Sequence, residues 1–159
     1  MNIAVKSLSA TTIRHIPFIA HTDAMMDVWS YMLRNGRGPK RMTLNELSVL
    51  LRSVTGFSKK VAYRAFPVGK APKLPFICYL CTNTNNFTAD NYVYQVIQEV
   101  DIELYTEKKD EASEQAVEEK LNENGLVWEK YEDYLDSENC YMITYTVQLV
   151  ITQKTVITT

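Results

Sequence analysis

The sequence of 159 residues has few of the side chains that build catalytic and cofactor sites: it contains two histidines, three cysteines and five glycines. Both histidines, His15 and His21, precede residue 42, so the rest of the chain lacks the commonest general base. Five glycines leave little room for a glycine-rich phosphate loop, and no such pattern occurs. The composition therefore argues against nucleotide chemistry, and we expect neither a catalytic residue set nor a cofactor.

A metal or redox site is suggested by one motif only, the CxxC spacing of Cys78 and Cys81. Both cysteines fall in an apolar segment with strand character, where residues three apart point to opposite faces, so their thiolates cannot converge on a metal. An odd number of cysteines in a chain without a secretory signal indicates reduced thiols packed as small apolar groups. Carboxylates such as Glu114 and Glu118 could bind a divalent cation, but an acidic helix face is more often solvated surface. We expect no metal site.

Long apolar runs are missing as well. No segment approaches the ~20 apolar residues that cross a bilayer, and the N-terminus lacks the pattern of a secretory signal. We therefore expect a soluble protein that is not exported and has no membrane partner. The length of the chain favours one domain with one core.

Two long strands and a helix are predicted in the second half of the chain. Alternating apolar and polar residues predict strands over 96–106 and 141–151, which we expect to share one sheet. Between them, residues 110–124 have a helical period, with Asp110 suited to the N-cap and Gly125 to the position after the helix. The apolar stripe expected on this helix consists of Ala112, Ala116, Val117 and Leu121.

A first helix is predicted over residues 43–55, because Thr43 and Glu46 have the spacing of a capping box and Gly56 can end the helix. Three shorter extended segments are predicted at 61–67, 74–82 and 127–134, the second of them apolar on both faces and suited to a central or interface strand. Residues 82–90 are predicted to form a long hairpin loop. Together these elements predict an α+β fold, with a mixed or antiparallel sheet of about four strands and two helices packed on it.

The first 41 residues differ from the rest. They show no sustained period and contain Pro17 and the breaker Gly36–Pro39. One helix is possible over residues 23–34. Two interpretations stay open: an arm that becomes ordered against a neighbouring subunit, or an extension from a misassigned start codon. Residues 42–159 are predicted to form a single α+β domain.

Charge is strongly segregated along the chain. Residues 52–73 carry six basic residues and no acidic one, whereas residues 99–138 carry fifteen acidic residues against four basic ones. Such segregation favours head-to-tail or ring contacts between copies, although an acidic helix can also be simple solvated surface. The basic residues lie among few aromatics, so sequence-specific DNA binding is not expected. The aromatic residues Trp128, Tyr131, Tyr134 and Tyr141 are predicted to serve in the core or in subunit contacts.

The order of the segments along the chain resembles that of a known family. The segments are, in order, the capped first helix, Leu74–Leu80, an Asn-rich stretch with Phe87, the strand and turn Val100–Asp110, and Trp128–Lys130. In this order the chain resembles the small tail-component proteins of siphophages that infect Gram-positive bacteria, namely tail terminator or tail completion proteins. The resemblance covers roughly residues 42–150, is strongest over 74–130, and does not include residues 1–41.

The resemblance implies a structural virion protein. Subunits of this family form a hexameric ring that caps the tail tube at the correct length and presents a surface for joining the head. The implied partners are further copies of the chain, the major tail tube protein and a head-tail connector or neck protein, with DNA only as passing cargo. The implied location is the virion tail, after assembly in the bacterial cytoplasm.

Candidate interface residues follow from the same resemblance. Three aromatic residues of the hairpin loop are predicted to contact the tube or a neighbour, two lysines to meet acidic residues of an adjacent copy, and the acidic helix to add further contacts. The aromatic residues are Phe87, Tyr92 and Tyr94, the lysines are Lys70 and Lys73, and the helix residues are Glu114 and Glu118.

Three alternatives to a tail terminator stay open. A neck or head-completion protein would also form a ring, but it would dock on the portal side. A small hydrolase would require a cleft with converging polar groups and perturbed pKa values. A solitary adaptor domain would be a monomer at working concentration.

Overall fold

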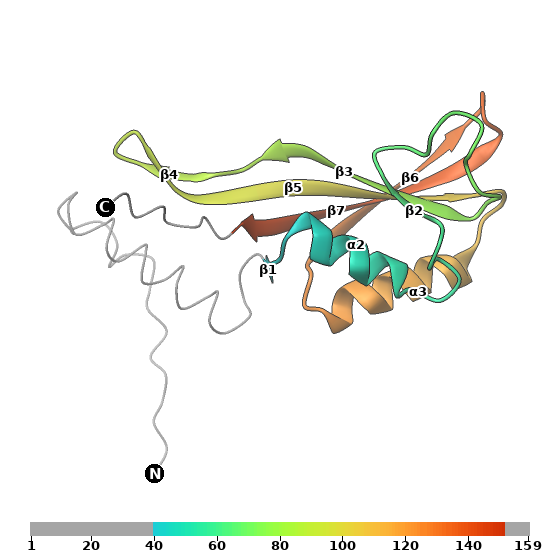
Figure 1. The fold of residues 1–159 in the computed structure, drawn as a ribbon, viewed down its shortest axis with the longest axis horizontal. Helices are drawn as coiled ribbons and strands as arrows, with labels where there is room; N and C mark the ends of the chain where they lie inside the picture. Colours follow the sequence, from blue (N-terminus) through green and yellow to red (C-terminus); the bar gives the residue numbers. More distant parts are fainter. Residues whose placement is uncertain (1–39, 152–159) are drawn as a thin grey trace, which may run out of the picture.

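The computed structural model describes residues 40–151, which fold as a mixed seven-stranded sheet with two helices (Figure 1). The helices are α2 (Leu44–Arg52) and α3 (Glu111–Glu123). The strands are β1 (Lys40–Arg41), β2 (Val61–Tyr63), β3 (Phe76–Thr84), β4 (Phe87–Ala89), β5 (Tyr92–Thr106), β6 (Trp128–Leu135) and β7 (Cys140–Ile151). The predicted α+β class is therefore confirmed. The possible helix over 23–34 and the C-terminal residues 152–159 lie outside the described residues.

The sheet is larger than the predicted four strands. Its order is β1-β7-β5-β3-β2, with β4 beside β5 and β6 beside β7. β5 and β7 pair antiparallel over eleven positions, from Val96 with Ile151 to Thr106 with Tyr141, which confirms that the two long strands share one sheet. The missed strands include β1 and β4, of two and three residues, because so short a strand shows no measurable alternation. β1 runs parallel to β7, with Lys40 opposite Leu149.

The predicted loop over residues 82–90 is in fact mostly strand. β3 continues to Thr84, and β4 pairs antiparallel with the start of β5, Ala89 opposite Tyr92. Asp90 and Asn91 close this hairpin with φ values of 48° and 63°. Two central residues with positive φ are typical of a two-residue turn whose twist matches that of the flanking strands, and Asp and Asn tolerate this conformation better than other non-glycine residues.

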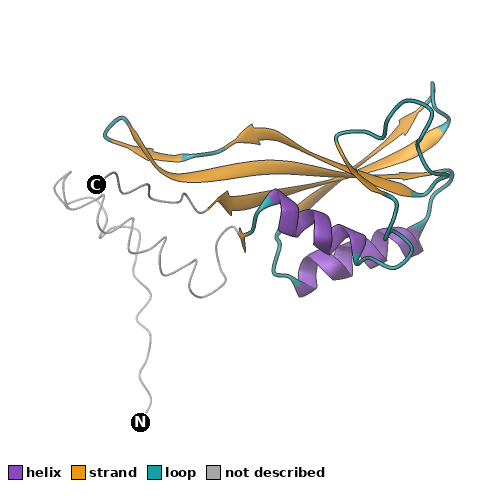
Figure 2. Ribbon diagram, in the orientation of Figure 1, coloured by secondary structure: helices purple, strands orange, loops and turns teal. Residues whose placement is uncertain are grey.

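Both helices cover the same face of the sheet (Figure 2). The predicted alternation of β5 is confirmed, because Val100, Ile102 and Leu104 are fully buried on that face. The apolar stripe of α3 was predicted partly wrongly: Ala112 is exposed, and Glu114 occupies a buried position together with Val117 and Leu121. The main core also contains Leu47, Leu50, Leu51, Val54, Phe57, Val61, Ile77, Tyr79, Leu126, Ile143, Tyr145, Val147 and Leu149.

The opposite face of the sheet is covered at one end by the connection between β2 and β3. Phe66 from this connection packs edge-on against Phe76 at 5.3 Å between ring centroids, and Phe76 stacks on Tyr105 of β5 at 5.0 Å. β3 lies inside the strand order, between β5 and β2. Its apolar residues on both faces therefore match the predicted central strand.

The start of α2 is fixed by the predicted capping box. The Glu46 amide donates to the Thr43 hydroxyl at 3.2 Å, and the Thr43 amide donates to the Glu46 carboxylate at 2.7 Å. The helix ends earlier than predicted, at Arg52, and Gly56 follows four residues later with a φ of 87°.

Replacing Thr43 with alanine is expected to lower the free energy of unfolding by about 1 kcal/mol, because an N-cap side chain satisfies an otherwise unpaired helix amide. Thr55→Ala is the matched control, since Thr55 is exposed and lies beyond the helix. Urea unfolding of the two variants measures the difference, and equal stabilities would show that the cap contributes nothing.

Candidate functional site

The β4–β5 hairpin projects from the body of the domain, past the ends of both helices (Figure 1). It carries the three aromatic residues that the sequence pointed to. Tyr92 is 72% exposed, Tyr94 is also exposed, and Phe87 is half-buried with its ring 6.2 Å from that of Tyr94. Val93, between the two tyrosines, is exposed as well. The structure therefore places Phe87 beside Tyr94, with Tyr92 and Val93 exposed on the same projecting hairpin.

Lys70 and Lys73 lie in the connection between β2 and β3 and are exposed. A hydrogen bond from the Lys70 amide to the Pro67 carbonyl, at 2.9 Å, and the positive φ of Gly69 (72°) form a turn at this point. Neither ammonium group has an ion-pair partner within residues 40–151. Both charges are therefore available to a partner.

Glu114 and Glu118, by contrast, are engaged within the chain. Glu114 lies 2.7 Å from the Lys109 ammonium group and 3.1 Å from that of Lys130, and Lys130 also donates to Glu118 at 2.7 Å. The Tyr145 hydroxyl donates to Glu118 at 3.3 Å. These contacts fasten α3 to β6, to β7 and to the connection that precedes the helix.

The pKa values of this cluster follow from its geometry. Burial acts to raise the pKa of Glu114, but the hydrogen bonds and charges of Lys109 and Lys130 outweigh it, so the pKa lies below its ordinary value. The hydrogen bond to Glu118 is the main cause that raises the pKa of Lys130. Burial, followed by the nearby carboxylates, raises the pKa of Tyr145. At neutral pH Glu114 is therefore a carboxylate, Lys109 and Lys130 are ammonium groups, and Tyr145 is a neutral phenol.

The CxxC cysteines do not form a site in this structure. Cys78 lies opposite Glu103, which faces away from the helices, whereas Cys81 lies opposite Val100, which faces them. The prediction that their side chains point to opposite faces is confirmed. Burial, and secondarily the Glu103 carboxylate, raise the pKa of the Cys78 thiol to about 11. Such a thiol is a weak nucleophile at neutral pH.

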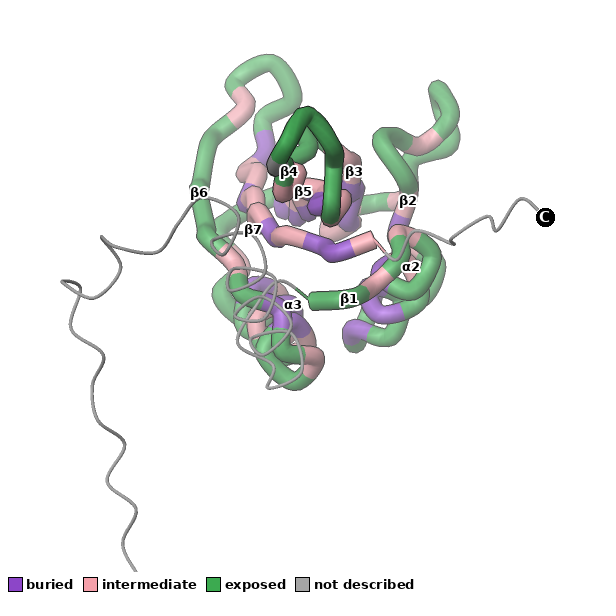
Figure 3. The backbone as a smooth tube through the Cα atoms, turned by 90° about the vertical axis from the view of Figure 1, so that its left-hand side faces the viewer, coloured by how far each residue is buried: buried purple, intermediate pink, exposed green. Residues whose placement is uncertain are grey.

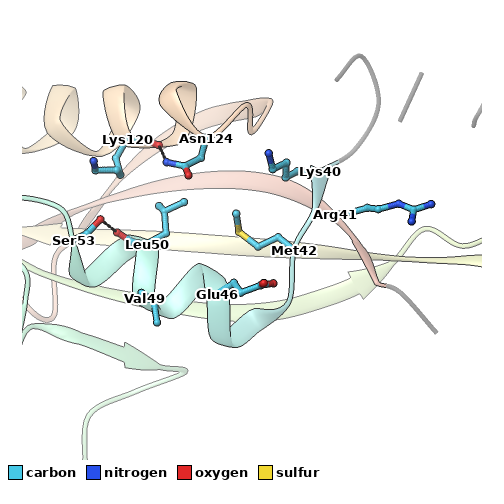
Figure 4. A pocket seen from close by; sticks show the side chains of 9 residues that line it. All are labelled: Lys40, Arg41, Met42, Glu46, Val49, Leu50, Ser53, Lys120 and Asn124. Carbon is cyan, nitrogen blue, oxygen red and sulfur yellow. Dashed lines mark hydrogen bonds between the residues drawn. The ribbon is translucent and has the colours of Figure 1, made fainter. Parts of the chain in front are cut away.

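A groove of about 460 Å³ separates α2 from α3 beside β1. Figure 4 shows Met42 and Leu50 pointing into the space between the helices, whereas Arg41 points away from it. The one carboxylate of its lining, Glu46, is held by the capping box of Thr43. The remaining lining residues are Lys40, Val49, Ser53, Lys120 and Asn124. The groove has an apolar floor with lysines at its rim.

Within residues 40–151 no three histidine, cysteine or carboxylate side chains are grouped as metal ligands would be. Neither helix in this part of the chain is long and apolar enough to cross a bilayer.

The position of Glu114 is the main feature that sequence reasoning missed. Its spacing to Val117 and Leu121, three and seven residues, places it on the inward stripe of α3, which is a signal that the sequence contains. Its partners could not be identified in this way, since Lys109 and Lys130 lie outside the helix. Among the four aromatic residues, Trp128 packs against Tyr145 and Tyr134 against Tyr141, whereas Tyr131 is exposed.

The sequence of the chain matches no protein-family model and no curated protein. Among solved structures, its fold is similar to that of a chain in the virion of a native gene transfer agent particle, with a TM-score of 0.48 and 12% sequence identity, over 64% of this chain and 88% of that one.

Proposed function

We propose that this chain is a structural virion protein that forms a ring at the end of a phage tail tube and joins the tail to the head. Its role is assembly, and it catalyses no reaction. The proposed partners are further copies of the chain, the tail tube protein and a connector or neck protein, and DNA passes without being bound. The proposed location is the virion tail, after assembly in the host cytoplasm.

The observation that carries this proposal is the projecting hairpin. The hairpin exposes Tyr92 and Tyr94, and tyrosine is enriched at the centres of protein interfaces. The hairpin extends the two-stranded end of a sheet whose other end is fixed by the helices and the core. A projecting hairpin with exposed tyrosine side chains is suited to binding a flat or grooved protein surface such as the end of a tube.

The resemblance in the order of the sequence segments to tail terminator proteins suggests that the surface bound by the hairpin is the end of a tail tube. Most residues of the segments that carry it, from the capped helix to Trp128, lie in helices and strands of the structure. The hairpin with Phe87 and Tyr94 is one of these segments. A ring subunit of this kind uses one surface for the tube and another for its neighbours.

The proposal is tested by mixing the purified chain with tubes assembled from the cognate tail tube protein. We expect rings at tube ends by electron microscopy, and we expect Tyr92→Ser with Tyr94→Ser to reduce the fraction of capped ends at least about tenfold, as the loss of interface anchors does. Val127→Ser is the control, because Val127 is exposed but lies between α3 and β6, outside the hairpin.

If the rings bind isolated portal or connector complexes and do not bind tubes, the chain is a neck protein and not a tail terminator. A chain that binds neither tubes nor connectors would contradict the proposal altogether. Equal capping by the hairpin variant and the wild type would assign tube binding to another surface.

A further inference from the structure

The sheet has two lateral edges that lie on opposite sides of the domain. Within residues 40–151, β2 pairs only with β3 and forms one edge, whereas the other edge consists of β6 beside the first part of β7 and of β1 beside its end, with β5, β3 and β7 between the two edges (Figure 3). An edge strand directs alternate backbone N–H and C=O groups away from its neighbour, so it can contact another chain. Each edge is extended by a connection: residues 64–75 follow β2, and residues 136–139 follow β6.

The two edges carry opposite charge. The basic edge, defined as β2 with its flanking residues, has five cations and no carboxylate: Lys59, Lys60, Arg64, Lys70 and Lys73. The acidic edge, defined as β6 with the turn into β7, has five carboxylates: Glu129, Glu132, Asp133, Asp136 and Glu138. Its only cation, Lys130, is directed to Glu114 and Glu118 of α3.

Most of these charges have no ionic partner within residues 40–151. None of the five cations forms an ion pair there, and among the five carboxylates only Glu132 does, with Lys109. Unpaired charges of one sign attract a surface of the opposite sign, and they steer the approach of a partner. The complementary surface is present on the same molecule, at the other edge of the sheet.

Each edge also presents exposed aromatic rings. Tyr63 on β2 is 50% exposed, and Tyr131 on β6 is 66% exposed, with Tyr134 also exposed on that strand. Tyrosine combines an apolar ring with a polar hydroxyl, so it suits the centre of an interface whose rim is charged. Both edges therefore have the composition of interface halves, and their charges are complementary.

We propose that the basic edge of one copy binds the acidic edge of the next copy, with Lys70 and Lys73 meeting Glu129 and Asp133. Because the two edges differ, this contact is heterologous, and it closes into a ring when the rotation between copies divides a full turn. The inference rests on the proposed ring assembly and names the surfaces that form it. It also replaces α3 as the acidic partner, since Glu114 and Glu118 are engaged within their own chain.

The test uses two charge-reversed versions of the full chain. One carries Lys70→Glu and Lys73→Glu, which places carboxylates at these two contact positions of the basic edge. The other carries Glu129→Lys and Asp133→Lys, which places ammonium groups at these two contact positions of the acidic edge. All four residues are exposed, so each variant is expected to fold, and circular dichroism verifies this. Lys108→Glu is the control, because Lys108 is exposed and lies between β5 and α3, outside the two edges.

Light scattering at low ionic strength, with and without tube protein, gives the assembly mass. We expect the wild type and the control to assemble, and each reversed variant alone to associate at least about tenfold more weakly. An equimolar mixture of the two variants is expected to regain the wild-type mass, because in every contact between the two variants a carboxylate again faces an ammonium group at these positions.

The outcomes separate this inference from the proposed function. If the wild type assembles and both reversed variants assemble equally well, the edges are not the contact, although the ring remains. If each variant fails and the mixture also fails, charge complementarity between the edges is rejected. A wild-type chain that stays monomeric with and without the tube overturns both proposals.

Discussion

Leu47→Ala is expected to lower the free energy of unfolding by about 2–5 kcal/mol, the usual cost of truncating a fully buried leucine. Leu47 lies on α2 with no exposed surface, in the main core between the helices and the sheet. Its removal leaves a cavity that the closely packed core around it fills only in part. A loss of this size is a large fraction of the stability of a typical domain.

Val49→Ala is the matched control, because Val49 lies on the same helix but is 63% exposed. Its replacement is expected to change the stability by less than about 0.5 kcal/mol. Urea unfolding followed by circular dichroism measures both variants, and the midpoint of Leu47→Ala should fall while the slope stays constant. Similar midpoints for the two variants would mean that α2 does not pack on the sheet as described.

Glu114→Gln is expected to cost about 1–3 kcal/mol. Removing one partner of a buried ion pair commonly costs more, but the side chains of Lys109 and Lys130 are partly exposed, so water recovers part of the loss. Glu119→Gln is the control, since Glu119 lies on the same helix and is exposed. It is expected to have little effect. Equal losses from both substitutions would reject the structural role of the Glu114 cluster.

The effect of Glu114→Gln should also depend on pH. The pKa of Glu114 is lowered in the folded state from its ordinary value of 4.5, so its stabilising contribution is present above that value and is lost as the pH falls through the folded pKa. The difference in stability between the wild type and Glu114→Gln should therefore be constant from pH 5 to 8, within the range where such carboxylates are ionised, and should shrink in more acidic solution. Asp110 and Glu46 also have lowered pKa values, but the wild type and Glu114→Gln both contain them, so their contributions cancel in the difference.

The sequence predicted the elements whose signals are local. The capping box of Thr43 and Glu46, the N-cap Asp110 and the alternation of β5 and β7 all depend on residues within a few positions of one another, and the structure confirms them. Elements defined by distant partners were missed. β1 exists only because Lys40 and Arg41 lie beside Leu149 and Val150 of β7.

The candidate surfaces were predictable to different degrees. The aromatic residues of the hairpin and the basic residues 52–73 are visible in the composition, but their positions on a projecting arm and on one sheet edge depend on strand order. The acidic residues within 99–138 form two groups, those in ion pairs within the chain and those without one, and composition alone cannot separate the two. Glu114 and Glu118 are paired with lysines of the same chain, whereas Glu129 and Asp133 remain unpaired on β6 within the described range.

The most direct test of the central claim is the mass of the purified full-length chain in solution, measured by light scattering with and without its cognate tail tube protein. The account predicts a closed oligomer, a hexamer by family resemblance, either for the chain alone or once the tube protein is added. A chain that stays monomeric in both conditions would contradict it.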